Sequence, residues 1–230
     1  YISFLMNKKQ LLEELKSEGF SRKIIDAFSK VKREDFVPNH LRIYAYNNEP
    51  LPIGNGATIS QPYTIAFMLD LLELNKLDNK IIANKTKGQE SSGELSYNKP
   101  KILEIGSGCG YVLALINEIS KNSEIYGIER IKGLVEKSRK VISKKIRVIH
   151  GDGSNGLQKE APFNRILVSA AFPIIPENLF EQLKESGILV SPIKNSIFQF
   201  KKINGKIKSK EFYGFVFVPI IKNDLNTENY

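Results

Sequence analysis

The sequence predicts an α/β fold in which helices cover both faces of a largely parallel sheet. From residue 101 onward, short apolar runs alternate with stretches of helical periodicity. Neighbouring parallel strands need a crossover connection, usually a helix, so this alternation is typical of a parallel sheet. Near the end, apolar and polar residues alternate on either side of Asn204 and Gly205, a strong signal for a hairpin turn. We therefore expect an antiparallel hairpin to finish the sheet.

The first 74 residues are expected to form three helices and one loop. Apolar residues at helical spacing predict a helix over 8–18, and Ser21 is placed to cap a second helix. The segment 47–63 holds so many prolines and glycines that we expect a shaped loop without regular structure. Pro62 suits the first turn of the third helix. Loops of this kind often carry function.

The remaining segments are assigned from their apolar pattern, and the whole chain, 1–230, is interpreted as a single domain. Residues 75–99 are polar and lack periodicity, which predicts an exposed insertion between the N-terminal part and the core at 100–230. We expect strands over 101–106, 124–129, 146–150, 165–171 and 187–193, helices over 112–120, 134–142 and 179–184, and hairpin strands over 198–202 and 206–217.

Composition excludes several classes of protein. Hydrophobic residues make up 41% of the 230 residues, which is ordinary for a globular protein. The one cysteine, Cys109, cannot form an internal disulfide, so we expect a reducing compartment, the cytoplasm. No apolar run approaches the roughly 20 residues that cross a bilayer, so no membrane association is expected. With two histidines and one cysteine, we expect no metal site.

The net charge of +9 raises the possibility of a nucleic-acid partner, because basic surfaces attract phosphate polymers. The lysines come as scattered pairs, however, without interleaved aromatic residues or a recognition helix. We therefore interpret the charge as a solvated lysine-rich surface and expect no specific nucleic acid.

A glycine-rich turn follows the first core strand and carries the strongest functional signal. Gly106, Ser107 and Gly108 lie at the carboxyl end of that strand, where open α/β sheets bind their ligands. The turn lacks the G-x-G-x-x-G spacing of dinucleotide sites, because position 111 is tyrosine. Glu104, inside the strand, is a poor neighbour for a pyrophosphate but a good one for a positively charged sulfonium cofactor with an amino group. S-adenosylmethionine is therefore the expected cofactor.

Two further strand ends support this cofactor. Glu129 stands 23 residues after Gly106, where a carboxylate accepts hydrogen bonds from both hydroxyls of a ribose. Asp152 and Gly153 follow the third strand, where an aspartate and a neighbouring N–H can bind an adenine edge. The glycine turn with Glu104, Glu129, and Asp152 with Gly153 are each weak signals alone, but they lie at the ends of three successive strands of one α/β unit.

Several motifs resemble the protein-L-isoaspartate (D-aspartate) O-methyltransferase family. The two most specific are the segment Thr58-Ile59-Ser60-Gln61-Pro62 and the block that runs from Gly151-Asp152-Gly153 to Ala161-Pro162-Phe163-Asn164. Others are Arg33-Glu34-Asp35-Phe36-Val37-Pro38, Leu51-Pro52-Ile53-Gly54, Ser169-Ala170-Ala171 and Phe215-Val216-Phe217-Val218-Pro219. The resemblance covers most of the chain apart from the insertion and the two ends.

The resemblance implies a Rossmann-like class I S-adenosylmethionine-dependent methyltransferase with a seven-stranded sheet, an N-terminal helical extension and a C-terminal hairpin. It implies methyl transfer to the free α-carboxylate of isoaspartyl residues in damaged proteins, which starts repair through a succinimide and leaves S-adenosylhomocysteine. It assigns Ser60 as the active-site serine. Its cofactor contacts correspond to Thr58, Ile59, Glu104, Gly106, Glu129, Asp152 and Gly153. The sequence departs from the family at Leu157, Asn164 and Lys194.

The residue types suit this chemistry. A carboxylate with a pKa near 4 is ionised at pH 7, so its attack on a methyl sulfonium needs no general base. The protein must supply alignment, and Ser60 could donate a hydrogen bond that fixes the acceptor carboxylate. Two alternatives stay open: a methyltransferase of the same fold with another acceptor such as RNA, and a noncatalytic S-adenosylmethionine-binding adaptor. We expect a monomer.

Overall fold

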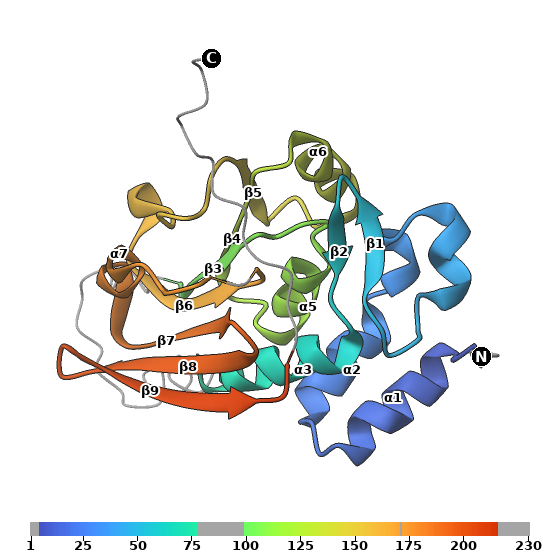
Figure 1. The fold of residues 1–230 in the computed structure, drawn as a ribbon, viewed down its shortest axis with the longest axis horizontal. Coiled ribbons are helices and arrows are strands. Elements are labelled where there is room, and N and C mark those ends of the chain that lie inside the picture. Colours follow the sequence, from blue (N-terminus) through green and yellow to red (C-terminus); the bar gives the residue numbers. More distant parts are fainter. Residues whose placement is uncertain (1–4, 78–98, 171, 216–230) are drawn as a thin grey trace, which may run out of the picture.

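The computed structural model describes residues 5–77, 99–170 and 172–215. Its main sheet has seven strands in the order β5-β4-β3-β6-β7-β8-β9 (Figure 1). The first five of these, β5 to β7, pair in parallel, and β8 and β9 are antiparallel to their neighbours. The predicted fold class is thus confirmed.

The elements run in this order along the chain. The N-terminal part contains α1 (Lys8–Ser17), α2 (Arg22–Lys30), the short 3₁₀ helices η1 (Arg33–Phe36) and η2 (Asn39–Tyr44), β1 (Leu51–Gly54), β2 (Ala57–Ile59) and α3 (Pro62–Leu71). The core contains β3 (Lys101–Ile105), α5 (Tyr111–Ile119), β4 (Glu124–Glu129), α6 (Lys132–Val141), β5 (Arg147–His150), η3 (Gln158–Glu160), β6 (Phe163–Val168), α7 (Glu177–Glu181), β7 (Leu183–Ile193), β8 (Ser196–Ile203) and β9 (Lys206–Tyr213).

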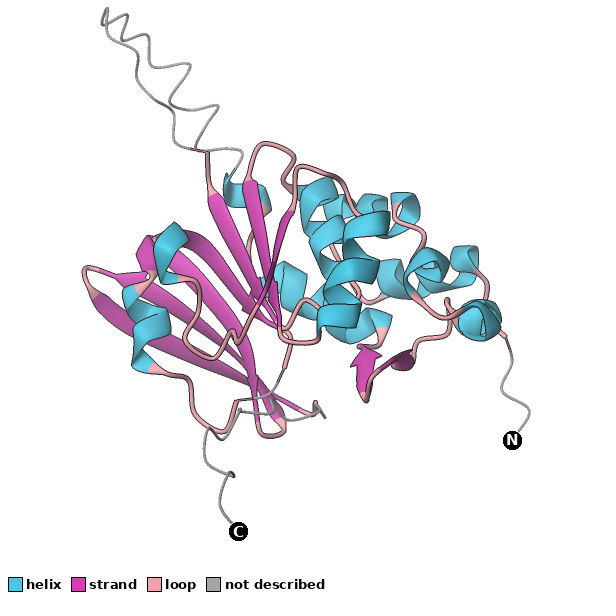
Figure 2. Cartoon of the chain, turned by 90° about the horizontal axis from the view of Figure 1, so that it is seen from above, coloured by secondary structure: helices cyan, strands magenta, loops and turns pink. Residues whose placement is uncertain are grey.

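The two faces of the sheet bury different apolar clusters because successive side chains of a strand point to opposite sides. Ile102 of β3 packs with α2, α3, α5 and α6, whereas the next residue, Leu103, packs on the opposite face with residues of α7. Figure 2 shows the longer helices gathered on one side of the sheet and short helices on the other. The helices α1 and α2 share the first cluster with the core strands, so the N-terminal part and the sheet have a common hydrophobic interior.

Two sequence expectations were wrong. The segment 47–63, expected to lack regular structure, contains the antiparallel pair β1 and β2, in which Leu51 pairs with Ile59. Buried and exposed residues alternate along β1, as they do in a half-buried strand, although the segment is rich in proline and glycine. The helix expected over 179–184 ends at Glu181, and β7 already begins at Leu183, which pairs with Phe163 across the sheet.

The expected insertion lies largely outside the described residues. Residues 75–77 are helical; Asn75 and Lys76 are exposed as predicted, whereas Leu77 is buried. Residues 216 and 217 of the expected hairpin, and residue 171 of the expected strand 165–171, also lie outside the described part. Among the residues that the structure describes, no helix is long and apolar enough to cross a membrane.

A clamp fixes the C-terminal end of α3 to the sheet. Gln199 of β8 donates to the carbonyl of Leu71, and Arg165 of β6 donates to the carbonyl of Leu72. Lys201 of β8 forms an ion pair with the carboxylate of Glu73. Three side chains from two strands therefore hold the last turn of this helix, whose first turn follows Ser60.

Candidate functional site

A cavity of about 830 Å³ lies at the carboxyl ends of β3, β4, β5 and β6. The strand ends form one wall, the segment from Asn55 to Thr64 forms another, and Tyr213 to Phe215, at the end of β9, complete the lining. This is where open α/β sheets bind ligands, and the volume lies in the range of small-molecule sites.

The glycine turn between β3 and α5 depends on backbone conformations that favour glycine. Gly106, Gly108 and Gly110 all have positive φ angles, of 76°, 52° and 86°. The amides of Gly106 and Ser107 donate to the carbonyl of Ile128, at 2.9 and 3.2 Å. The turn is thereby fastened to the end of β4 and presents its backbone to the cavity.

Glu129, at the end of β4, lines the cavity and is only 6% exposed. One carboxylate oxygen accepts the amide of Gly108 and the other accepts the amide of Ile131, both at 2.8 Å. A carboxylate offers about four acceptor positions, so these two bonds leave capacity for a ribose diol. Glu129 therefore also shapes the glycine turn, a role that the sequence did not reveal.

Glu104 is 1% exposed and lies beneath the turn. Its Oε1 accepts the hydroxyl of Ser169 at 2.6 Å, and its buried Oε2 has no hydrogen-bond partner among the described residues. Burial raises the pKa of Glu104 to about 8; the bond from Ser169 opposes this rise and the charge of Glu129 adds to it. A buried acceptor without a partner is costly, and it suits a ligand that brings an ammonium group.

Asp152 and Gly153 occupy the end of β5 with different constraints. Asp152 is exposed, and its Oδ1 accepts the amide of Ser154 at 2.8 Å. At Gly153, an added Cβ would lie 2.7 Å from the Cγ2 atom of Ile105 and 2.8 Å from that of Ile128. Packing against these two side chains therefore requires glycine at position 153.

Ser60 directly follows β2, and its position argues against a purely structural role. The residue that caps α3 is Gln61, and no side-chain hydrogen bond caps that helix. Thr58 and Ser60 line the large cavity, whereas Ile59 is buried. Ile59 contributes instead to a smaller adjoining cavity of about 50 Å³, together with Glu104, Ser107 and Tyr111.

The structure thus brings all ten residues expected from the sequence to two neighbouring cavities. The larger is lined by Thr58, Ser60, Gly106, Gly108, Glu129, Asp152 and Gly153, and the smaller by Ile59, Glu104 and Ser107. Thr58, Ser60, Gly106 and Gly108 also line the smaller one, so the two cavities share a boundary.

Sequence reasoning missed Ser169, which lines both cavities, and the fully buried Arg33, which lines neither but binds the main chain at Ser60. Ser169 follows β6 at the same sheet edge as Gly106, so the strand-end rule that found Glu129 could also have found it. Arg33 donates to the carbonyl of Ser60 from 27 residues away, a contact for which the sequence gives no local signal.

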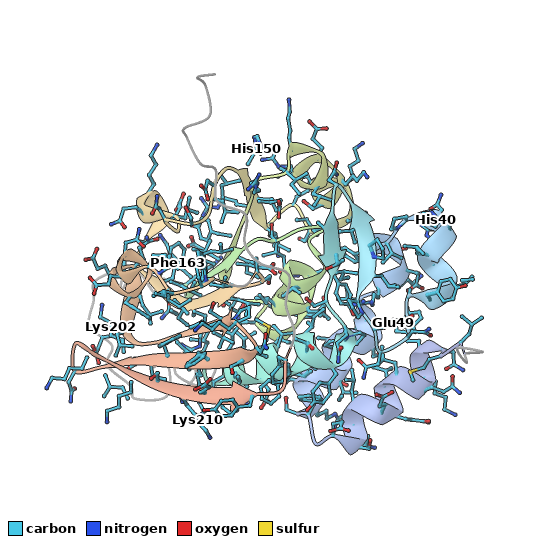
Figure 3. The ribbon with its side chains drawn as sticks, viewed as in Figure 1. His40, Glu49, His150, Phe163, Lys202 and Lys210 are labelled. Atoms are coloured by element: carbon cyan, nitrogen blue, oxygen red, sulfur yellow. The ribbon has the colours of Figure 1, made fainter. Side chains whose placement is uncertain are left out.

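Among the described residues, no histidine or cysteine lines the larger cavity, although Cys109 lines the smaller one. His40 and His150 are exposed (Figure 3). The Nε2 atom of His150 lies 3.0 Å from the carbonyl oxygen of Arg130. Burial raises the pKa of the Cys109 thiol to about 11, so it stays protonated at neutral pH. Among the described ranges, no group of three or more histidine, cysteine or acidic residues could hold a metal ion.

The sequence matches known proteins along most of its length. The pattern of the protein-L-isoaspartate(D-aspartate) O-methyltransferase (PCMT) family matches residues 6–82 and 95–225. The chain belongs to this family. A protein-L-isoaspartate O-methyltransferase of Dictyoglomus turgidum is 40% identical over 222 residues, covering 93% of this chain and 90% of the relative. One of Methanothrix thermoacetophila is 36% identical over 223 residues, covering 94% and 95%.

Solved structures of protein-L-isoaspartate O-methyltransferases share this fold. A structure described as a putative protein-L-isoaspartate O-methyltransferase from Plasmodium falciparum, in complex with S-adenosyl-L-homocysteine, has a TM-score of 0.75 and 26% identity and covers 95% of this chain and 100% of that one. Another has a TM-score of 0.76 at 24% identity, with coverage of 94% and 67%.

The positions at which the chain departs from the family lie away from the large cavity. The amide of Leu157 donates to Gln182, and Asn164 accepts the amide of Lys101 at 3.0 Å. Lys194 has a φ of +53° in the tight turn between β7 and β8, a conformation that glycine adopts more easily. None of the three is among the residues that line the cavity.

Proposed function

We propose that this protein transfers a methyl group from S-adenosylmethionine to the free α-carboxylate of L-isoaspartyl residues, and to the side-chain carboxylate of D-aspartyl residues, in damaged proteins and peptides. The observation that carries the proposal is that one cavity is lined on one side by the glycine turn, Glu129 and Asp152, and on the other by Thr58 and Ser60. Membership of the isoaspartyl methyltransferase family supplies the acceptor. The following backbone amide nitrogen would then attack the methyl ester and expel methanol, forming a succinimide, and addition of water to the succinimide can give normal aspartate.

The residues present fit the proposed cofactor. The partnerless Oε2 of Glu104 would accept a bond from the amino group, and the remaining acceptor positions of Glu129 would receive the ribose hydroxyls. Asp152 and the backbone of Gly153 would bind the adenine edge. When bound, S-adenosylmethionine supplies an electrophilic methyl group on a sulfonium. The side chains proposed here bind and orient, and none of them forms a covalent bond.

The acceptor side needs positioning more than proton transfer. An α-carboxylate is already ionised at neutral pH, so its oxygen is nucleophilic without a base. The Ser60 hydroxyl would donate a hydrogen bond to that carboxylate and fix the direction of its lone pair. Effective molarities in model reactions show that such alignment can contribute about 7 to 11 kcal/mol. The neighbouring Thr58 and Gln61 would help to exclude water.

Methyl transfer to a matched pair of peptides tests the function. S-adenosylmethionine with a tritiated methyl group is incubated with the enzyme and an isoaspartyl peptide, or with the same peptide containing normal aspartate. We expect base-labile label on the isoaspartyl peptide alone. Label on RNA with none on either peptide would support the alternative acceptor, and cofactor binding without transfer to any acceptor would support the adaptor. Either result would refute the proposal.

We also propose that the chain folds as one domain and acts as a cytoplasmic monomer without a specific nucleic-acid partner. The shared apolar cluster of α1, α2 and the sheet supports one domain, and the lone, buried Cys109 is compatible with a reducing compartment. Light scattering after size exclusion should give the mass of one chain. Unfolding in urea should follow one transition by every probe. A dimer mass, or two separated transitions, would contradict these points.

A further inference from the structure

Arg33 is a charged residue that is completely buried, with an exposed fraction of 0%. Arginine is almost never fully buried unless it has partners. Its Nη1 donates to the main-chain carbonyl of Ser60 at 2.9 Å, and its Nη2 donates to that of Glu49 at 3.2 Å. Its Nε has no hydrogen-bond partner among the described residues. The guanidinium is therefore bound to the two ends of the segment that contains β1 and β2.

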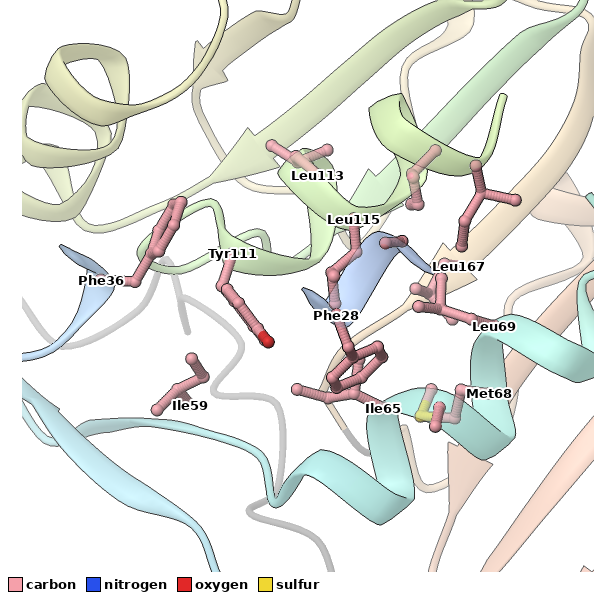
Figure 4. Packing of buried hydrophobic residues seen from close by; sticks show 14 of the residues in the cluster. Phe28, Phe36, Ile59, Ile65, Met68, Leu69, Tyr111, Leu113, Leu115 and Leu167 are labelled. Atoms are coloured by element: carbon pink, nitrogen blue, oxygen red, sulfur yellow. The ribbon is translucent and has the colours of Figure 1, made fainter. Parts of the chain in front are cut away.

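The same guanidinium contacts the other half of the site. Its Cζ lies 5.5 Å from the centre of the Tyr111 ring. Tyr111 is the first residue of α5, directly after the glycine turn, and it packs edge-on against Phe28 and Phe36. Figure 4 shows the Tyr111 ring among Phe28, Phe36, Ile59 and Ile65. Arg33 thus lies between the segment that carries Ser60 and the helix that begins at the cofactor turn.

Stability alone does not account for an arginine at this position. Burial lowers the pKa of Arg33 because the charged form loses its hydration, and electrostatic interactions with Tyr111, Cys109, Glu49 and Tyr46 only partly oppose this. Buried ionic groups can often be replaced by apolar residues with no loss of stability. A guanidinium, however, holds two acceptors at once with a fixed angle between its donors, which neither lysine nor methionine can do.

We propose that Arg33 is a positioning residue that holds the Ser60 peptide against the start of α5, so that the Ser60 hydroxyl faces the acceptor carboxylate. This inference rests on the proposed function. It places no atom of Arg33 on substrate or cofactor, because Arg33 lines neither cavity and acts through the carbonyl of Ser60.

Arg165 provides a matched control. It too is a buried arginine, 5% exposed, and it donates to the main-chain carbonyls of Leu72, Asn164 and Glu73. Burial lowers its pKa as well, to about 10. Its contacts lie at the far end of α3, so it shares the chemistry of Arg33 without any contact to the Ser60 segment.

The first test compares Arg33→Lys with Arg165→Lys. The kcat and KM for an isoaspartyl peptide, the Kd of S-adenosylhomocysteine and the Tm are measured for each. We expect Arg33→Lys to lower kcat by on the order of 10- to 100-fold, because small displacements of positioning groups have effects of that size. The Kd should stay within a few-fold, and Arg165→Lys should keep its kcat. An unchanged kcat in Arg33→Lys, or equal kcat losses in both variants, would overturn the proposal.

A double-mutant cycle tests whether Arg33 acts through Ser60. In a Ser60→Ala background, Arg33→Lys should cause no further loss of kcat, because the hydroxyl that it positions is absent. A full additional loss would show that Arg33 acts independently of Ser60 and would refute the assignment. If Arg33→Lys does not fold, Arg33→Met, which fills similar space without a charge, takes its place in the same cycle.

Hydrogen exchange of the amides from 57 to 64 gives a readout that needs no activity. We expect faster exchange there in Arg33→Lys than in wild type or Arg165→Lys. Unchanged exchange would refute the positioning role even if the enzyme is active. If wild type does not methylate the isoaspartyl peptide, the proposed function fails, and the exchange data still decide whether Arg33 holds the Ser60 segment.

Discussion

Glu104→Gln should change how the stability of the free protein depends on pH. The glutamine keeps the size of the side chain and an acceptor for Ser169, but it cannot ionise. Glu104 is buried, and burial raises its pKa from the ordinary value of 4.5 to about 8. Its titration therefore differs between the folded and unfolded chain, which makes the free energy of unfolding depend on pH.

The sign follows from where the proton is bound. Below about pH 4.5 both the folded and the unfolded carboxyl hold the proton, so the group adds no pH dependence. Between about 4.5 and 8 the unfolded chain has released its proton and the folded chain has kept it, so stability falls as the pH rises. At about 1.4 kcal/mol per pH unit, the loss between pH 5 and 8 is on the order of 4 kcal/mol.

Urea unfolding at pH 5, 6, 7 and 8 measures this effect as a difference between wild type and Glu104→Gln. The difference cancels the titration of other groups, and the variant should gain relative stability as the pH rises. Glu136→Gln, which changes an exposed residue of α6, serves as the control and should give no such trend. A difference between wild type and Glu104→Gln that stays constant within about 1 kcal/mol across this range would refute the reasoning.

The proton that Glu104 holds in the free protein should also affect cofactor binding. An ammonium group beside Glu104 would favour its ionised form, so binding of S-adenosylhomocysteine should release a proton near neutral pH. Calorimetry in two buffers of different ionisation enthalpy counts that proton. We expect wild-type affinity to rise with pH up to about 8 and the affinity of Glu104→Gln to stay level. Proton release by Glu104→Gln equal to that of wild type would contradict the assignment.

Three further substitutions test the site and its turn. Ser60→Ala should lower kcat while the Kd of S-adenosylhomocysteine stays within a few-fold; equal losses of both would show that the segment only shapes the cofactor site. Glu129→Ala should weaken cofactor binding and, because it removes the acceptor of the Gly108 and Ile131 amides, reduce stability in urea by about 2 to 3 kcal/mol; unchanged affinity in a titration would remove the ribose assignment. Gly110→Ala should lower the free energy of unfolding by about 2 to 4 kcal/mol, because the φ of residue 110 is +86° and the new Cβ would lie 2.9 Å from the Cγ2 atom of Ile142. Gly19→Ala is the control, because Gly19 has a similar φ of +85° but a new Cβ there would have no atom within 4 Å. This variant should lose only the stability that backbone strain costs. Equal losses of stability in Gly19→Ala and Gly110→Ala would show that crowding contributes nothing.

Local patterns were sufficient for the sheet and for much of the cavity. The apolar runs at β3, β4 and β5 predicted parallel strands, and parallel strands place their carboxyl ends at one edge. Glu129 and Asp152 could therefore be brought together from their positions in the sequence alone.

The two errors came from strand pairings, one between neighbouring segments joined by residues 55–56 and one between distant segments. The strands β1 and β2 have only four and three residues, and their pairing stabilises them despite Pro52 and Gly54, which predict a loop. The start of β7 at Leu183 depends on pairing with Phe163, a contact that helical spacing around Leu179 cannot reveal.

The site residues that were missed act through similarly distant contacts. Ser169 reaches Glu104 across 65 positions, and Arg33 reaches Ser60 across 27. Ser169 could still have been found, because it follows β6 at the same sheet edge as Gly106, whereas nothing near Arg33 in the sequence indicates its contact with Ser60.

The clamp on the last turn of α3 has a consequence for how the chain can vary in length. The contacts of Gln199, Arg165 and Lys201 lie between Ser60 and the stretch that starts at residue 78. Residues added or deleted after that point would have to break the clamp before they could shift the N-terminal turn of the helix. We therefore expect that insertions or deletions in that stretch, where residues 83–94 fall outside the family pattern, leave the position of Ser60 unchanged.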